Sequence, residues 1–192
     1  MESCFLLHPQ DTDGDVLQNV KLDAEKLNLD CTLRAQPENH VLASILQYML
    51  IGSVLFVSSA YLTGFLRELG KEHASLFSNF VKRSLLSTKQ DIAFFSSSGK
   101  MDTGEKYVLT HSLIAKDSRD RQFKLIFPVN SENNISEMVE IFVRFIQALE
   151  DGELTSEVLT KLKKARQVGK IILVEADVKN SCVIFPEVIN NA

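Results

Sequence analysis

The sequence has only three cysteines, Cys4, Cys31 and Cys182, and they are widely spaced along 192 residues. None belongs to a Cys-x-x-Cys pair, and an odd number of cysteines in a secreted protein would leave one thiol unpaired. A disulfide framework is therefore not expected, and a reducing, cytoplasmic location is favoured. The N-terminal segment MESCFLLHPQD has no basic region and only a short apolar run, which does not match a secretory signal.

Neither sign of charge dominates, since the sequence has 21 lysines and arginines and 25 aspartates and glutamates, for a net charge of −4. This mild acidity gives no electrostatic reason to expect nucleic-acid binding. Hydrophobic residues make up 45% and charged residues 24%, as in folded globular proteins. The length favours a single domain over residues 1–192, large enough to bury a core without a disulfide or metal.

No motif for a metal, cofactor or phosphate is complete. The run Asp11-Thr-Asp13-Gly-Asp15 resembles the start of a calcium loop, but Val16 and Leu22 stand where that loop needs Gly and Glu. We expect a polar turn whose carboxylates cap the following helix. The four histidines are far apart in the sequence and form no zinc pattern with the cysteines: His8, His40, His73 and His111. We therefore expect no metal and no cofactor.

Ser98-Gly99-Lys100 resembles the end of a phosphate-binding loop, but Phe94 and Met101 replace the required Gly and Ser or Thr. We expect an ordinary hairpin loop there. No Gly-x-Ser-x-Gly elbow is present, and no cysteine has a nucleophile signature. Acid–base catalysis by dispersed carboxylates leaves no sequence pattern, so the sequence leans against an enzyme without excluding one.

Hydrophobic periodicity predicts an α+β fold that begins with a β-α-β unit. Residues Cys4 to Leu7 form a short apolar run, and Leu29 to Ala35 alternate between apolar and polar, as in strands. Between them, apolar residues recur every three or four positions from Val16 to Leu27, as in an amphipathic helix.

The second half is expected to contain an antiparallel meander, two helices and a C-terminal β-hairpin. The meander strands are Ile92 to Phe95, Lys106 to Ala115 and Gln122 to Pro128. The helices are expected at Ile135 to Leu149, before Gly152, and at Ser156 to Val168. The hairpin strands are expected at Ile171 to Val174 and Cys182 to Phe185.

The most unusual feature is the absence of charge from Val41 to Leu66, where 18 of 26 residues are apolar. A long apolar central helix, covered by other elements, is the favoured interpretation. The segment is also long enough for a transmembrane helix, which would make the protein membrane-associated. A buried strand at Val54 to Val57 with flanking turns is a third interpretation. An amphipathic helix from about Arg67 to Leu86 follows the segment.

These patterns favour a non-catalytic interaction or assembly protein that contacts a protein partner, or a second copy of itself, through the apolar helix 41–66 and the amphipathic helix after it. The contact residues are expected to be Leu55, Val57, Ala60, Gly64, Phe77 and Val81. One alternative is a single-pass membrane protein with a cytoplasmic α+β domain.

One basic cluster could contact an anionic surface such as membrane lipid, although cations at a helix C-terminus also stabilise the helix itself. Its members are Lys161, Lys163, Lys164, Arg166 and Lys170. A further alternative is an enzyme or small-ligand-binding protein whose site is assembled from dispersed polar residues. That hypothesis predicts a pocket where several of the following converge: Asp91, His111, Asp117, Glu175 and Asp177.

Overall fold

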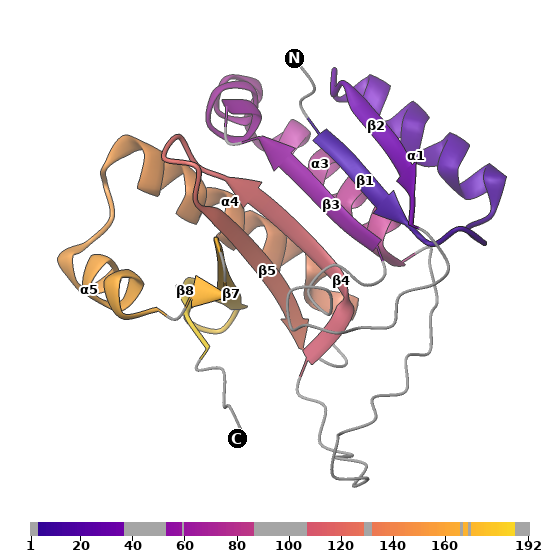
Figure 1. The fold of residues 1–192 in the computed structure, drawn as a ribbon. Helices are drawn as coiled ribbons and strands as arrows, with labels where there is room; N and C mark the ends of the chain where they lie inside the picture. The colour runs from indigo at the N-terminus through magenta and orange to yellow at the C-terminus, as the bar shows by residue number, and fades with distance from the viewer. Residues whose placement is uncertain are drawn as a thin grey trace, which may run out of the picture.

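A computed structural model describes residues 4–36, 53–58, 60–86, 107–128, 132–165, 167–168 and 170–186 (Figure 1). The chain begins with strand β1 (Cys4–His8), helix α1 (Gly14–Lys26) and strand β2 (Cys31–Ala35). β1 and β2 pair in parallel, with Cys4 opposite Cys31, which confirms the predicted β-α-β unit. The Asp13 carboxylate caps α1 by accepting from the Asp15 amide at 2.9 Å, as the acidic turn before the helix predicts.

The remaining strands extend this unit into one mixed sheet. They are β3 (Ser53–Ser58), β4 (Tyr107–Lys116), β5 (Gln122–Pro128), β6 (Gln167–Val168), β7 (Ile171–Asp177) and β8 (Cys182–Ile184). The strand order is β2-β1-β3-β4-β5-β7-β6, and β8 pairs with β7. β4 with β5, and β7 with β8, pair antiparallel as predicted. The predicted strand Ile92 to Phe95 lies outside the described residues.

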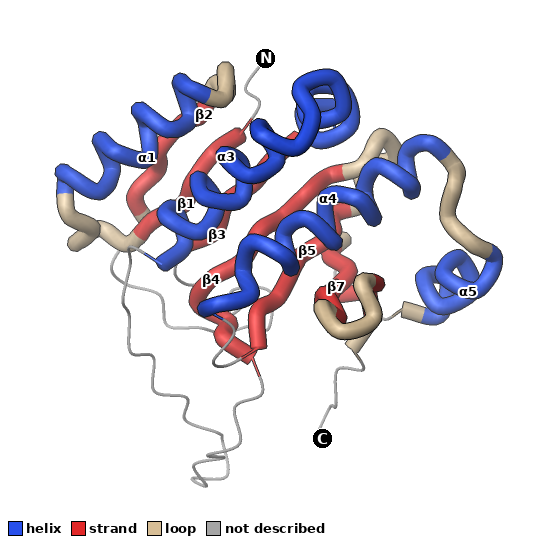
Figure 2. Tube along the Cα trace, turned by 180° about the vertical axis from the view of Figure 1, so that it is seen from behind, coloured by secondary structure: helices blue, strands red, loops and turns tan. Residues whose placement is uncertain are grey.

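Helices α1, α3 (Leu66–Leu86) and α4 (Ile135–Asp151) cover one face of the sheet, as Figures 1 and 2 show from opposite sides. A π-helical turn, η1 (Tyr61–Phe65), leads into α3, and a 3-10 turn, η2 (Glu132–Asn134), leads into α4. α4 ends at Gly152, whose φ of 75° suits glycine because it has no Cβ. Helix α5 (Ser156–Lys164) begins at the cap residue Thr155 and ends before the predicted Val168, which belongs to β6.

The core lies between the sheet and these helices. Alternate strand residues point into it, so Leu55, Leu113 and Leu125 are all fully buried. The predicted stripe of α4 packs against them, with Phe142 and Ile146 also fully buried. Each fully buried side chain of this size stabilises the fold by about 1.5–3 kcal/mol. Burial of these side chains is thus a large favourable contribution to the stability of the fold.

The predicted long apolar helix over Val41 to Leu66 is wrong for its described central part. Residues Ser53–Ser58 form β3, which lies between β1 and β4 in the interior of the sheet. Val54 and Leu55, which point to opposite faces, are both fully buried. A strand buried on both faces has no polar alternation, so its sequence resembles that of a buried helix. Residues 41–52 lie outside the described part. No helix within the described ranges has the length and apolar character to cross a membrane.

Candidate functional site

The second face of the sheet, opposite the helices, carries a row of side chains from six neighbouring strands. Strand register aligns them in the order Thr32, Phe5, Phe56, Ile114, Lys124 and Leu173. Phe5 and Phe56 lie on the neighbouring strands β1 and β3, and their rings stack with centroids 4.1 Å apart and an interplanar angle of 15°. The guanidinium carbon of Arg34 lies 5.1 Å from the Phe5 ring centroid. This geometry is suited to a cation–π contact.

A groove with a volume of about 410 Å³ lies over Phe5, Phe56 and Ile114. Both phenylalanines are only partly buried, so their rings remain accessible from the groove. Its other lining residues come from the neighbouring strands and the β4–β5 turn: Cys4, Val57, Ser58, Ala60, Lys116, Asp117 and Gln122. The groove therefore combines an apolar aromatic floor with a polar rim.

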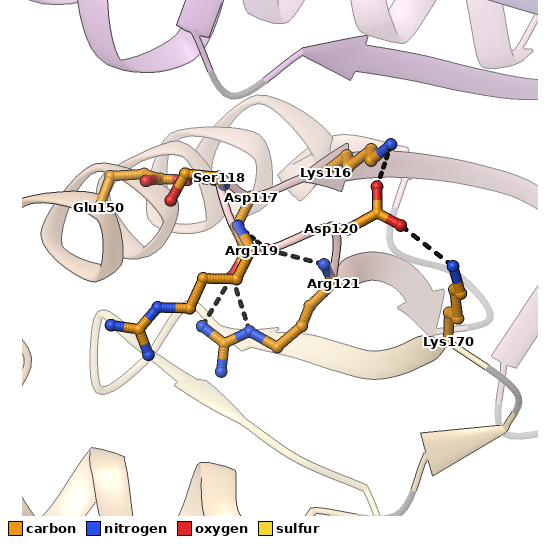
Figure 3. A network of polar contacts seen from close by, with 8 residues as sticks. All are labelled: Lys116, Asp117, Ser118, Arg119, Asp120, Arg121, Glu150 and Lys170. Carbon is orange, nitrogen blue, oxygen red and sulfur yellow. Dashed lines mark hydrogen bonds and ion pairs between the residues drawn. The ribbon is translucent and has the colours of Figure 1, made fainter.

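The β4–β5 turn beside the groove is held by a buried carboxylate (Figure 3). Asp117 accepts from the amides of Arg119 and Arg121 at 3.0 and 2.7 Å. Its second oxygen lies 2.7 and 2.6 Å from Nε and Nη2 of Arg121. The Asp117 side chain is only 2% exposed, whereas that of Arg121 is 30% exposed. These contacts compensate the buried charge and fix the turn.

A second carboxylate in the same turn positions the lysine at the groove rim. Asp120 forms ion pairs with Lys116 and with Lys170, the latter at 3.1 Å (Figure 3). Hydrogen bonds from Lys116 and, to a lesser extent, from Lys170 lower the pKa of the Asp120 carboxyl below its usual value. The Ser118 amide also donates to Glu150 Oε1 at 2.7 Å, which connects the turn to α4. The charged groups of the turn are thus largely paired with one another.

The π-helical turn η1 supports the opposite rim, immediately after Ala60. Tyr61 donates through its hydroxyl to the Leu27 carbonyl at 3.2 Å, and the Leu62 carbonyl accepts from Nε2 of Gln147 at 2.7 Å. Burial is the main cause that raises the pKa of Tyr61 above its ordinary value, and nearby Cys4 adds to it. Tyr61 therefore serves as a neutral hydrogen-bond donor that fixes this rim.

A fully buried lysine, Lys124, is the polar residue that sequence analysis missed. It lies in the middle of β5, opposite Ile114 of β4 and Leu173 of β7. Burial lowers its pKa to about 8. The alternation of Phe123, Leu125 and Phe127 correctly predicts which side of β5 faces the core, but it suggests solvent on the side where Lys124 is buried. No local sequence signal distinguishes these two environments for a lysine in a strand.

Four of the six predicted contact residues are not on the surface. Leu55, Val57, Phe77 and Val81 all lie in the core, where they pack against other parts of the same chain. Leu55 and Val57 belong to β3, which is an interior strand in place of the predicted helix, and Phe77 and Val81 lie on the side of α3 that packs on the core. Ala60 and Gly64 are exposed, and Ala60 lines the groove. Of the four core residues, only Val57 also lines the groove, next to Ala60.

The predicted basic cluster is divided between two elements. Lys163 and Lys164 are exposed on α5, while Lys161 pairs with Glu157 at 2.6 Å. Lys170 belongs to the turn before β7 and pairs with Asp120. Arg166 lies outside the described residues.

The polar residues expected to form a catalytic or ligand pocket do not converge in the part of the chain that the structure describes. Asp117 follows β4 next to the start of β7, because Gln122 is opposite Ile171. Asp177 lies six residues further along β7 than Ile171, roughly 20 Å at the usual rise per residue. His111 pairs with Ser53 within the sheet, and Asp91 is not among the described residues.

No cluster of three or more His, Cys, Asp or Glu side chains suited to a metal occurs within the described ranges. The three cysteines, Cys4, Cys31 and Cys182, are not joined in disulfides. No protein-family model, no curated protein and no solved structure matches this chain. The assignment of function therefore depends on the geometry of the groove.

Proposed function

We propose that this protein is a non-catalytic interaction protein that binds an extended apolar segment of a partner protein in the groove. The observation that carries the proposal is the stacked pair Phe5 and Phe56, which forms a partly exposed floor in a groove of about 410 Å³. Aromatic side chains in a shallow apolar depression are typical of the few residues that dominate protein–protein binding energy.

The polar groups at the rim support recognition more than catalysis. Asp117 is paired with Arg121, and Lys116 is paired with Asp120. A general base or nucleophile must be able to reach a substrate, whereas these groups are held by one another. Lys116 is 55% exposed as a side chain and can still contact a carboxylate of a bound segment. We therefore expect the preferred segment to combine an aromatic or aliphatic residue with a nearby acidic residue.

The low number and wide spacing of the cysteines, which form no disulfide, favour a reducing compartment, and we accordingly propose that binding takes place in the cytoplasm. The proposed function differs from the sequence-based expectation in the residues that form the contact surface. The surface consists of strand residues from β1 and β3 together with the β4–β5 turn, which the sheet brings together.

The experiment is a selection of random peptides on the wild-type protein, followed by measurement of the dissociation constants of the selected peptides for single-residue variants. Phe56→Ala removes half of the aromatic floor, so we expect binding to weaken by about 30-fold, as for a typical hot-spot residue. The matched control is Leu22→Ala, because Leu22 is 46% exposed on α1, which packs on the opposite face of the sheet.

Amide chemical shifts measured during the titration should change in β1 and β3. Selected peptides that bind Phe56→Ala as tightly as the wild type, or that shift only residues of the helical face, would refute the proposal. Circular dichroism of each variant shows whether a loss of binding arises from unfolding.

A second candidate function is binding of a small apolar ligand, which the groove volume favours. Pockets for small ligands usually measure about 300–1,000 Å³, and this groove lies within that range. Titration with a library of aromatic fragments distinguishes the candidates. Saturable binding of a fragment to the Phe5–Phe56 floor that no selected peptide displaces would favour the small ligand.

A further inference from the structure

Within the described residues, the outer edge of β2 has backbone hydrogen-bonding groups that no other strand pairs with. β2 is the end strand of the sheet order, and it pairs with β1 through one edge only. The Asp30 carbonyl accepts from the Cys4 amide at 3.0 Å, and the Gln36 amide donates to the His8 carbonyl at 2.8 Å. Because alternate residues of a parallel strand face the same neighbour, Thr32 and Arg34 also direct their backbone groups toward β1.

The intervening residues Cys31, Leu33 and Ala35 therefore direct their amides and carbonyls away from the sheet. No strand among the described residues pairs with this edge. Ala35 is exposed, and Leu33 is only partly buried. A strand edge of this kind is a template for pairing with another chain.

We propose that two copies of this chain associate through their β2 edges, antiparallel across a two-fold axis at Leu33, to form one continuous sheet. This inference does not depend on the groove. With that axis, Leu33 lies opposite Leu33 of the second copy, and Cys31 lies opposite Ala35 of the second copy. These are the residues with outward backbone groups on both strands, so each of the three opposed pairs exchanges two hydrogen bonds.

The side chains of β2 are compatible with the same register. On the second face, Thr32 lies opposite Arg34 of the second copy, so a hydroxyl meets a guanidinium and like charges are not opposed. On the helix-covered face, the two Leu33 side chains meet between the small residues Cys31 and Ala35. A closed two-fold pairing of this kind uses one surface that is complementary to itself.

Helix α1 provides a second contact with the same symmetry. Asp23 and Lys26 line a separate depression between α1 and α3. Lys21 and Glu25 therefore lie toward the opposite side of α1. Both of these residues are exposed. Since the two copies of α1 run antiparallel across the axis, Lys21 of one copy approaches Glu25 of the other, and the charges are complementary.

The opposite end of the sheet does not offer an equivalent edge. There β7 is covered by two short strands, β6 of two residues and β8 of three residues. Short edge strands resist pairing with another chain. β2, with five residues, is therefore the edge that we assign to self-association.

The test compares Ala35→Pro with Ala35→Thr in the full chain by sedimentation equilibrium at micromolar concentrations. The Ala35 amide is not used toward β1, so proline removes an intermolecular donor while leaving the β1–β2 hydrogen bonds in place. Threonine keeps the donor and suits a strand. We expect the wild type and Ala35→Thr to form dimers, and Ala35→Pro to weaken dimerisation at least tenfold. A wild type that remains monomeric, or a dimer unaffected by Ala35→Pro, would overturn the proposal.

A second variant keeps the test decisive if Ala35→Pro does not fold. In Leu33→Cys, combined with Cys31→Ser and Cys182→Ser, the two new thiols face each other across the axis. The Cα separation of a hydrogen-bonded antiparallel pair, about 5.5 Å, lies within the range of Cα separations found in disulfides. Mild oxidation should then produce a covalent dimer joined through residue 33, as determined by peptide mass spectrometry. Failure to form this crosslink would refute the two-fold register.

Discussion

Replacing the buried lysine of β5 should stabilise the protein. Lys124 is fully buried in the centre of the sheet, and burial lowers its pKa from 10.5 to about 8. One pKa unit corresponds to about 1.4 kcal/mol, so the charged form of Lys124 is disfavoured in the folded state by about 3 kcal/mol. At pH 7 the lysine is protonated in both the folded and the unfolded chain. Almost all of this cost of about 3 kcal/mol for burying the charge therefore lowers the free energy of unfolding.

The sign of the pH dependence follows from the same pKa. Between about pH 8 and pH 10.5 the folded chain loses the Lys124 proton while the unfolded chain retains it, so the free energy of unfolding rises with pH in this window. In Lys124→Met this contribution is absent. We expect the variant to be more stable than the wild type by about 3 kcal/mol at pH 7 and by about 1 kcal/mol at pH 9.5.

The assay is urea unfolding of both proteins at pH 7 and pH 9.5, followed by circular dichroism. The upper pH is kept below the ordinary pKa of tyrosine. Above that value the unfolded chain ionises Tyr61 before the folded chain does, so the free energy of unfolding would fall with pH. Lys163→Met is the matched control, since Lys163 is exposed on α5. The reasoning is refuted if Lys124→Met is less stable than the wild type at pH 7, or if their difference is the same at both pH values.

Two further predictions concern single contacts. Asp117→Ala leaves Arg121 and two turn amides without their carboxylate partner. We therefore expect the free energy of unfolding, measured by urea unfolding, to fall by about 2–3 kcal/mol. An unchanged unfolding midpoint would contradict the structural role of Asp117 in the turn. Gly152→Ala places a Cβ at a φ of 75°, so we expect its free energy of unfolding, measured by thermal unfolding, to fall by about 1 kcal/mol. Gly152→Asn should have little effect, because asparagine tolerates this conformation. Equal stability of all three proteins would show that α4 does not depend on this turn.

The elements with a strong local pattern were predictable from the sequence. The apolar positions of α4 recur with helical spacing, and Gly152 marks the end of the helix. Strong alternation in β5 predicts both the strand and its core-facing side, with Phe123, Leu125 and Phe127 buried. In these segments, local propensity and burial favour the same structure.

For β3 the sequence leaves a buried helix and a buried strand at Val54 to Val57 both open, and the structure has the strand. Its residues are apolar on both faces, so the hydrophobic period that distinguishes a strand from a helix is absent. The pairing of β3 with β1 and β4, which makes it a strand, depends on residues about 50 to 60 positions away. Tertiary contacts decide the structure of such a segment.

The groove could not be inferred for a related reason. Phe5, Phe56, Ile114 and Gln122 come from four different strands, and only the strand order makes them neighbours. In the sequence, each is an ordinary strand residue without a motif. The open edge of β2 likewise depends on its position at the end of the sheet.

The position of Lys124 also has a consequence for the chain before it folds. The segment Gln122–Pro128, QFKLIFP, is rich in residues that favour strands, and exposed segments of this kind can pair between unfolded chains. A positive charge in the middle of the segment repels a second copy stacked in register, and Pro128 interrupts the hydrogen bonding at its end. We therefore expect Lys124, whose burial is predicted to lower the stability of the native sheet, to protect newly made or unfolded chains from aggregation. Selection against aggregation is a physical reason to keep a charge in a strand where the folded protein would be more stable without it.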